Sequence, residues 1–147
     1  MYRVFLADDE PWILEGLRAC IDWETLGFTL CGTAENGLDA LEKIGRLRPD
    51  CLLADIRMPG MDGLTLIARA REENPRLRCA ILSGYAEFTY AREGIRQGVD
   101  GYLLKPIEET DLEALLHIMR SKLDMPLLLP TVADTPDPLE AVRQYVD

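Results

Sequence analysis

The sequence is short of positive charge, since 16 lysines and arginines stand against 26 aspartates and glutamates and give a formal net charge of −10. Such an acidic chain is poorly suited to bind nucleic acid or an anionic membrane surface by itself. It has no apolar run near the roughly 18 residues needed to span a bilayer. It also opens on a strand-like run in place of a basic and apolar signal segment. We therefore expect a cytoplasmic protein that binds no membrane.

Cysteine and histidine patterns typical of metal or redox sites are also missing. The four cysteines lie far apart in apolar surroundings and form no C-x-x-C pair (Cys20, Cys31, Cys51 and Cys79). His117, the single histidine, has no cysteine or histidine at ligand spacing. The pattern favours buried free thiols and a surface or packing histidine. The 147 residues are enough for one domain with a sizeable core.

The sequence does contain a regular alternation of strand and helix patterns over residues 1–123. The expected strands are Tyr2–Ala7, Phe28–Ala34, Cys51–Ala54, Arg78–Leu82 and Gly101–Leu104. The helices that follow them begin near Pro11, after the N-caps Asn36 and Asp62, near Ala86 (to about Gln97), and in the acidic turn Glu108–Asp111. Alternating strands and helices predict an α/β fold, a doubly wound five-stranded parallel sheet with helices on both faces.

Charged residues follow three of these strands at their carboxyl ends. Asp8 and Asp9 follow the first strand, Asp55 follows the third, and Lys105 follows the fifth. In an open parallel sheet these ends line one crevice, so three carboxylates and one ammonium are expected to converge there. We interpret this as a site for a divalent cation and a phosphoryl group. Two plainer roles stay open: an N-cap of the first helix for Asp8 or Asp9, and a solvated loop cation for Lys105.

The composition changes after Leu123. Four prolines between residues 125 and 138 predict an extended linker over residues 124–137. Asp137, Pro138 and Glu140 form a helix start, yet the chain stops at Asp147 without a C-cap. We expect residues 138–147 to be the start of a truncated helix of a further domain. The alternative is a short terminal helix that docks on the domain of residues 1–123.

Residues 1–123 resemble the receiver domain of two-component response regulators. The residues that carry the resemblance are Asp8-Asp9, Asp55 with the loop Ile56-Arg57-Met58-Pro59-Gly60-Met61-Asp62-Gly63, Ser83, and Tyr102-Leu103-Leu104-Lys105-Pro106. Further runs are similar to YesN-like regulators with an AraC-type DNA-binding output domain (Ile21-Asp22-Trp23, Ala34-Glu35-Asn36-Gly37, Leu82-Ser83-Gly84-Tyr85 and residues 141–146). The resemblance implies a flavodoxin-like sheet of strand order 2-1-3-4-5. Independently of the resemblance, we expect the Lys105–Pro106 bond to be cis, because that isomer is accessible only before proline and here would aim the lysine inward.

The resemblance also assigns a role to each residue of the crevice. Asp55 would be the phosphoacceptor, and Mg²⁺ or Mn²⁺ would be bound by Asp9 and Asp55, by Asp8 largely through water, and by the backbone carbonyl of Arg57. Lys105 and the Ser83 hydroxyl would contact the phosphoryl oxygens. Tyr102 would be the switch aromatic, turning into space that Ser83 vacates. For Tyr102, simple packing against the fourth helix is the alternative.

The implied partner is a sensor histidine kinase, and the implied role is signal transduction in a phosphorelay, without enzymatic turnover beyond the domain's own phosphorylation and dephosphorylation. A homodimer could form through the fourth helix, fifth strand and fifth helix. DNA would be bound only through the missing output domain.

Two other classes of protein fit the sequence less well. A phosphohydrolase with an aspartyl-phosphate would need a D-x-D pattern, and position 57 is Arg57; a flavin-binding flavodoxin would need a phosphate-cradling loop after the first strand.

Overall fold

The computed structural model describes residues 1–84, 96 and 98–125. The last helix start lies outside these residues, as do the predicted fourth helix apart from residue 96 and the linker apart from residues 124 and 125. The described strands are β1 (Tyr2–Ala7), β2 (Phe28–Ala34), β3 (Cys51–Asp55), β4 (Arg78–Ser83) and β5 (Gly101–Leu104). The described helices are α1 (Pro11–Cys20), α2 (Gly37–Leu47), α3 (Gly63–Glu73) and α5 (Glu109–Leu123). None of these helices is long and apolar enough to cross a membrane.

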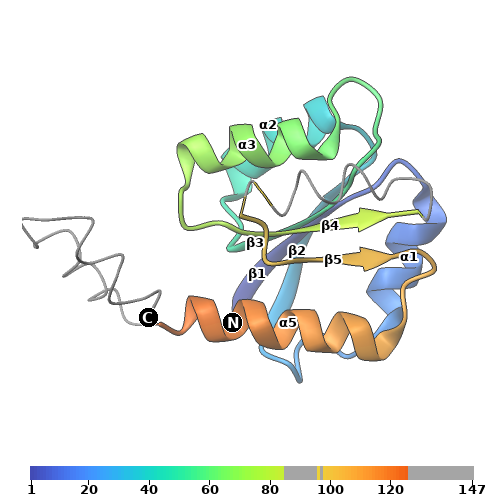
Figure 1. Ribbon diagram of the computed structural model, residues 1–147, viewed down its shortest axis with the longest axis vertical. Coiled ribbons are helices and arrows are strands. Elements are labelled where there is room, and N and C mark those ends of the chain that lie inside the picture. The colour runs from blue at the N-terminus through green and yellow to red at the C-terminus, as the bar shows by residue number, and fades with distance from the viewer. Residues whose placement is uncertain (85–95, 97, 126–147) are drawn as a thin grey trace, which may run out of the picture.

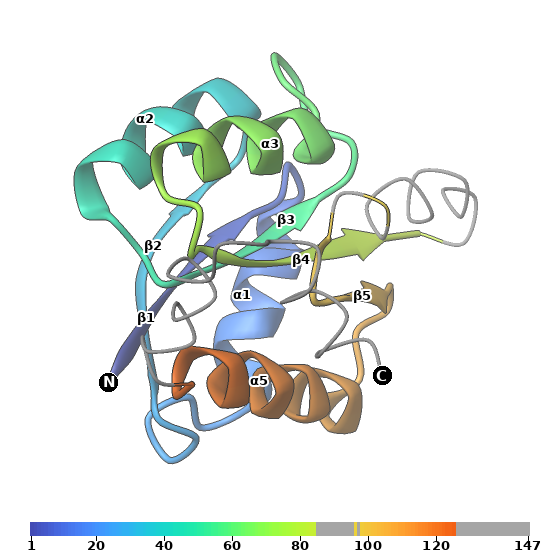
Figure 2. The ribbon, with the colours of Figure 1, turned by 60° about the vertical axis from the view of Figure 1, so that its left-hand side comes forward.

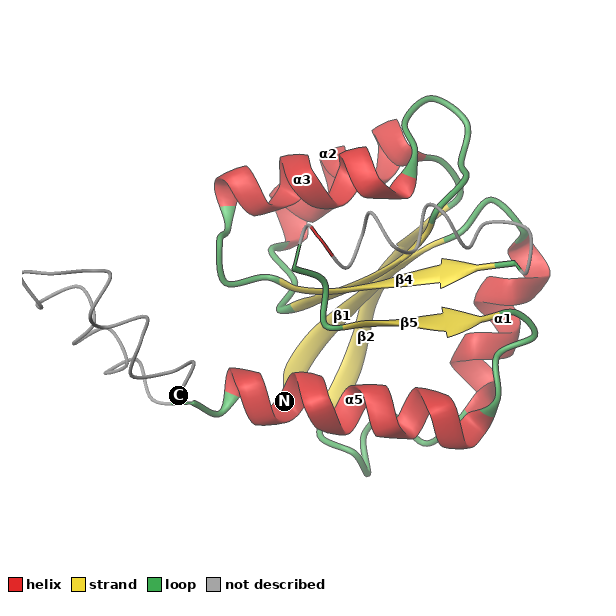
Figure 3. Cartoon of the chain, in the orientation of Figure 1, coloured by secondary structure: helices red, strands yellow, loops and turns green. Residues whose placement is uncertain are grey.

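All five strands pair in parallel, in the order β2-β1-β3-β4-β5, which confirms the predicted sheet (Figure 1). Helices α2 and α3 cover one face and α1 and α5 cover the other, as Figure 2 shows from the side. Figure 3 separates the layers by secondary structure. The predicted strand bounds hold for β1, β2 and β5, whereas β3 and β4 each extend one residue further, to Asp55 and Ser83.

The core lies on both faces of the sheet because successive side chains of a strand point to opposite sides. In β1, Phe5 packs with the α2 and α3 side, and Val4 and Leu6 pack with the α1 and α5 side. All three side chains are fully buried. A strand buried on both faces reads as a continuous apolar run, which is why these strands were visible in the sequence.

Helices α1, α2 and α3 begin where they were predicted, but the N-cap of α1 is not one of the two aspartates considered for it. Asn36 accepts a hydrogen bond from the Asp39 backbone N–H at 2.8 Å, and Asp62 accepts one from Thr65 at 2.8 Å, so both are N-caps. The N-cap of α1 is Glu10, whose side chain makes no capping bond. An N-cap role for Asp8 or Asp9 is therefore wrong, because the N-cap position belongs to a residue after both.

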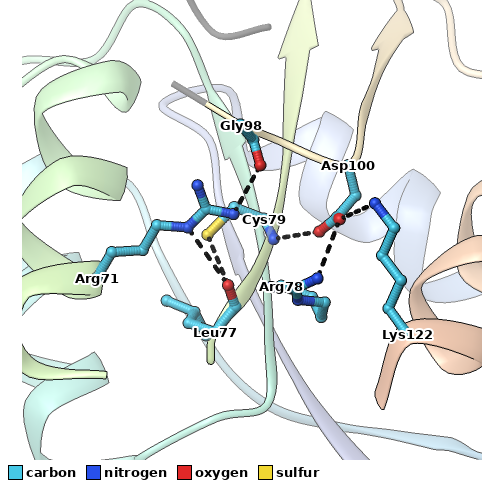
Figure 4. Close-up of polar contacts among 7 residues, drawn as sticks. All are labelled: Arg71, Leu77, Arg78, Cys79, Gly98, Asp100 and Lys122. Atoms are coloured by element: carbon cyan, nitrogen blue, oxygen red, sulfur yellow. Dashed lines mark hydrogen bonds and ion pairs between the residues drawn. The ribbon is translucent and has the colours of Figure 1, made fainter. Parts of the chain in front are cut away.

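A buried polar cluster, here called the Asp100 cluster, lies at the amino ends of β4 and β5 (Figure 4). The Asp100 carboxylate is 1% exposed and accepts hydrogen bonds from the Cys79 backbone N–H at 3.0 Å and from Lys122 Nζ at 2.6 Å. Arg78 Nη1 lies 3.5 Å from it. Since Lys122 belongs to the last turn of α5, the cluster attaches the end of that helix to the sheet.

Candidate functional site at the carboxyl end of the sheet

The parallel register brings three charged residues to one edge of the sheet. Ala7 pairs with Ala54, so Asp8 and Asp55 emerge side by side after β1 and at the end of β3. Ser83 pairs with Leu104, and the Lys105 backbone N–H donates to the Ser83 carbonyl at 2.8 Å. The Lys105–Pro106 peptide bond is cis, as predicted.

Lys105 is the centre of the site. Its Nζ lies 2.8 Å from Asp8 Oδ2, 3.2 Å from Glu10 Oε1 and 3.3 Å from Asp55 Oδ2. Its side chain is only 13% exposed, and those of Asp8 and Asp55 are 0% and 5% exposed. The alternative role of a solvated loop cation is therefore wrong for Lys105.

Negative charge accumulates around this lysine. Carboxylate oxygens of Asp8, Asp9, Glu10 and Asp55 all lie within 4.8 Å of one another. Burial, and then the charge of Asp8, raise the pKa of Asp55 to about 7 against the opposing effect of Lys105. Burial also raises the pKa of Asp8. Burial lowers the pKa of Lys105, but the surrounding carboxylates outweigh it and raise that pKa above its ordinary value. The unliganded site thus holds carboxylates whose ionisation is unfavourable.

These residues fit a small divalent cation. Asp8 Oδ2 is fully buried, and among the described residues it has no hydrogen-bond partner beyond its ion pair with Lys105 at 2.8 Å. Carboxylate oxygens are the ligands that Mg²⁺ and Mn²⁺ prefer. Asp9 also lines an open cavity of about 340 Å³, together with Ile56, Arg57, Met58, Pro59 and Asp62.

The loop after Asp55 is held by close backbone contacts. The Gly63 N–H donates to the Ile56 carbonyl at 2.8 Å, and the Gly37 N–H donates to the Pro59 carbonyl at 3.2 Å. A Cβ on Gly63 would lie 2.1 Å from the Asp55 carbonyl oxygen, and one on Gly37 would lie 2.1 Å from that of Met61. Only glycine fits at either position, so the starts of α2 and α3 clamp the loop that carries Arg57.

The structure thus brings Asp8, Asp9, Asp55 and Lys105 together, with Ser83 at the adjacent strand end and 2% exposed. Arg57 lines the cavity. Tyr102 does not enter the site: it is 42% exposed on β5 and lines a separate surface cavity with Leu104 and Ile118. Glu10 was not predicted, although its place directly after Asp9 was a usable signal.

The remaining candidate ligands stay outside the site. All four cysteines are free thiols, as predicted; Cys51 and Cys79 are buried, whereas Cys20 and Cys31 are only partly so. Burial raises the pKa of Cys79 to about 12 and that of Cys51 still higher, so neither is a thiolate at neutral pH. His117 is exposed on α5.

Comparison with known proteins agrees with this geometry. Residues 4–117 match the model of the response regulator receiver domain. The transcriptional regulatory protein YesN of Bacillus subtilis is 45% identical over 117 residues, which cover 80% of this chain and 32% of YesN. The chain spans about a third to a half of the length of the curated relatives it matches.

Solved structures agree as well. The REC domain of AraT, a response regulator from Geobacillus stearothermophilus, superposes with a TM-score of 0.81 at 44% identity, covering 84% of this chain and 95% of that one. A two component transcriptional regulator AraC from Clostridium phytofermentans gives 0.74 at 27% identity, covering 85% and 100%. Because the family model spans most of the chain and the receiver of AraT shares its fold at this identity, the chain belongs to the response regulator receiver domain family.

Proposed function

We propose that this domain accepts a phosphoryl group on Asp55 from the phosphohistidine of a sensor kinase. The observation that carries the proposal is the buried Asp55 carboxylate, 3.3 Å from the Lys105 ammonium and within 4.8 Å of three further carboxylates. Receiver domains are signalling modules of two-component systems, and the site has the charges that their reaction requires. A single phosphoryl group is taken up per chain.

In the proposed step, a carboxylate oxygen of Asp55 attacks phosphorus in line. The P–O bond to aspartate forms while the P–N bond to the kinase histidine breaks, and the electron pair leaves with the imidazole. Lys105 neutralises charge on the phosphoryl oxygens as a point charge, and Ser83 donates its hydroxyl to them. Asp9, Asp55, the Arg57 carbonyl and, through water, Asp8 would hold a Mg²⁺, which would supply further positive charge to these oxygens.

The proposed output lies beyond the described residues. Movement of Ser83 toward the phosphoryl group, with Tyr102 turning inward, would shift the population between two conformations. The surface around Tyr102, Leu104 and Ile118, each more than 40% exposed, would then differ between the two states and could pair two copies. We propose an AraC-type DNA-binding output domain, because YesN is named as a transcriptional regulator and another structural relative as an AraC regulator.

The experiment is phosphorylation by acetyl phosphate with Mg²⁺, followed by intact-protein mass. The wild-type chain should gain one phosphoryl group, and Asp55→Asn should gain none. Asp111→Asn is the matched control, because Asp111 is an exposed aspartate on α5, away from the site. A gain that persists in Asp55→Asn overturns the assignment, and continued release of phosphate from phosphomonoesters would indicate a phosphohydrolase instead.

A further inference from the structure

Glu10 contacts the reactive centre through its side chain. Its Oε1 lies 3.2 Å from Lys105 Nζ, and the carboxylate is 37% exposed. The residue is the N-cap of α1, yet it forms no capping bond, and its own backbone N–H is taken by Asp8 Oδ1 at 2.9 Å. The Glu10 side chain therefore pairs with Lys105 and does not cap α1.

The local sequence explains this orientation. Pro11 stands at the first helical position, and the residue before a proline is disfavoured from helical backbone angles. Glu10 is accordingly extended, with φ −101° and ψ 106°. Glutamate is also a poor N-cap compared with aspartate, asparagine or serine, so its side chain gains little by staying at the helix. Lys105 then offers the carboxylate a partner 95 residues away in the sequence.

Glu10 adds a charge that the proposed reaction does not need. The three carboxylates of Asp8, Asp9 and Asp55 carry formal charges that Lys105 and one divalent cation together cancel. Glu10 adds one further negative charge beside the lysine, where the phosphodonor, itself an anion, must approach. At separations of a few ångströms in a partly buried site, such a charge repels an anionic phosphodonor strongly.

We propose that Glu10 is a positioning residue that holds Lys105 in the unphosphorylated site and slows the phosphorylation of Asp55. It does so in two ways: it shares the ammonium that the phosphoryl group needs, and it repels an anionic donor. The inference rests on the proposed function. In this inference, Glu10 slows the phosphorylation of Asp55 by small phosphodonors, which takes place without a kinase.

The test compares Glu10→Gln with the wild-type chain at saturating Mg²⁺. Glu10→Gln should raise the second-order rate constant for acetyl phosphate, a dianion near neutral pH, by about three- to tenfold. The gain should be smaller with phosphoramidate, a monoanion, and should shrink as salt is added. The affinity for Mg²⁺ in the absence of a phosphodonor can be measured by thermal unfolding at increasing Mg²⁺ concentration. It should be about two- to fivefold lower in Glu10→Gln, because a nearby negative charge is lost.

Two controls separate this effect from altered folding. Glu10→Asn is also neutral but is a better N-cap, so it should react faster than wild type while α1 is stabilised. Glu15→Gln removes the same charge from an exposed position of α1 and should change the rate constant little. Equal rates for wild type and both neutral Glu10 variants with either donor would overturn the inference. A wild-type chain that gains no phosphoryl group would instead refute the proposed function.

Discussion

Buried acids lie at both ends of the sheet, in opposite electrostatic surroundings. At the amino end, the Asp100 carboxylate is bonded by a backbone N–H and by Lys122, with Arg78 close by. At the carboxyl end, four carboxylates lie within 4.8 Å of one another and three of them pair with Lys105. Among the described residues, one buried oxygen of Asp8 has no hydrogen-bond partner beyond its ion pair with that lysine. The first arrangement pairs its charge within the chain, whereas the second leaves an excess of negative charge.

The contrast separates stability from function. A buried carboxylate that is fully paired holds its neighbours in place, and its loss leaves them unsatisfied. Carboxylates that raise one another's pKa cost stability until a cation or a proton arrives. We therefore expect substitutions at the two ends to change the free energy of unfolding in opposite directions.

The largest expected change in the free energy of unfolding comes from a substitution at the amino end of the sheet. Asp100→Ala should lower the free energy of unfolding by about 3 kcal/mol, because the Cys79 N–H loses its acceptor and Lys122 and Arg78 lose their partner. Urea unfolding measures the change. Asp124→Ala is the control at the same end, since Asp124 is exposed and should contribute less than about 1 kcal/mol. Similar losses in the two variants would contradict the view that Asp100 is a structural centre.

A smaller effect of opposite sign is expected at the carboxyl end, and it depends on pH. The folded-state pKa of Asp55 is raised from its ordinary value near 4 to about 7, so the native state binds more protons than the unfolded state between these values. The stability that this group contributes is complete below pH 4 and is lost as pH rises through 7.

Asp55→Asn should therefore exceed wild type in stability by an amount that grows as pH rises from 4 to 7. The measurement is thermal unfolding without divalent cations, over this pH range. Asp111→Asn should run parallel to wild type. A stability difference between Asp55→Asn and wild type that stays constant with pH would show that the Asp55 carboxylate is not under electrostatic stress.

The smallest effect comes from the cation. At ten times its dissociation constant, Mg²⁺ should stabilise the wild-type chain by about 1.4 kcal/mol, seen as a rise in Tm. Asp9→Ala should lose this rise, since Asp9 is a proposed ligand. Asp100→Asn, altered only at the opposite end, should keep it. A rise that survives in Asp9→Ala would remove that residue from the metal site.

Local patterns were enough to predict the sheet and the meeting of Asp55 with Lys105. Strands buried on both faces are continuous apolar runs, and parallel pairing then brings their carboxyl ends together without further information. Asn36 and Asp62 were also predictable, because capping depends on residues only three positions away.

Long-range contacts explain what the sequence did not reveal. The partners of Asp100 come from β4 and from α5, and no periodicity connects them. Glu10 depends on a lysine that is distant in the chain, so its role required the fold. Tyr102 and Leu104 lie in an apolar run like those of the central strands, yet both are exposed, whereas Leu103 between them points to the opposite face and is buried with residues of α5.

The glycine contacts around the loop after Asp55 have a consequence for how such a domain can diversify. Gly37 and Gly63 fix the path of this loop through contacts of backbone with backbone, in which no side chain of the loop takes part except that of Met61. The loop is therefore held through its backbone on both sides of Arg57, at Ile56 and at Pro59. Sequence change in this part of such a domain is restricted first at Gly37 and Gly63, because a side chain at either position would displace the loop beside Asp55.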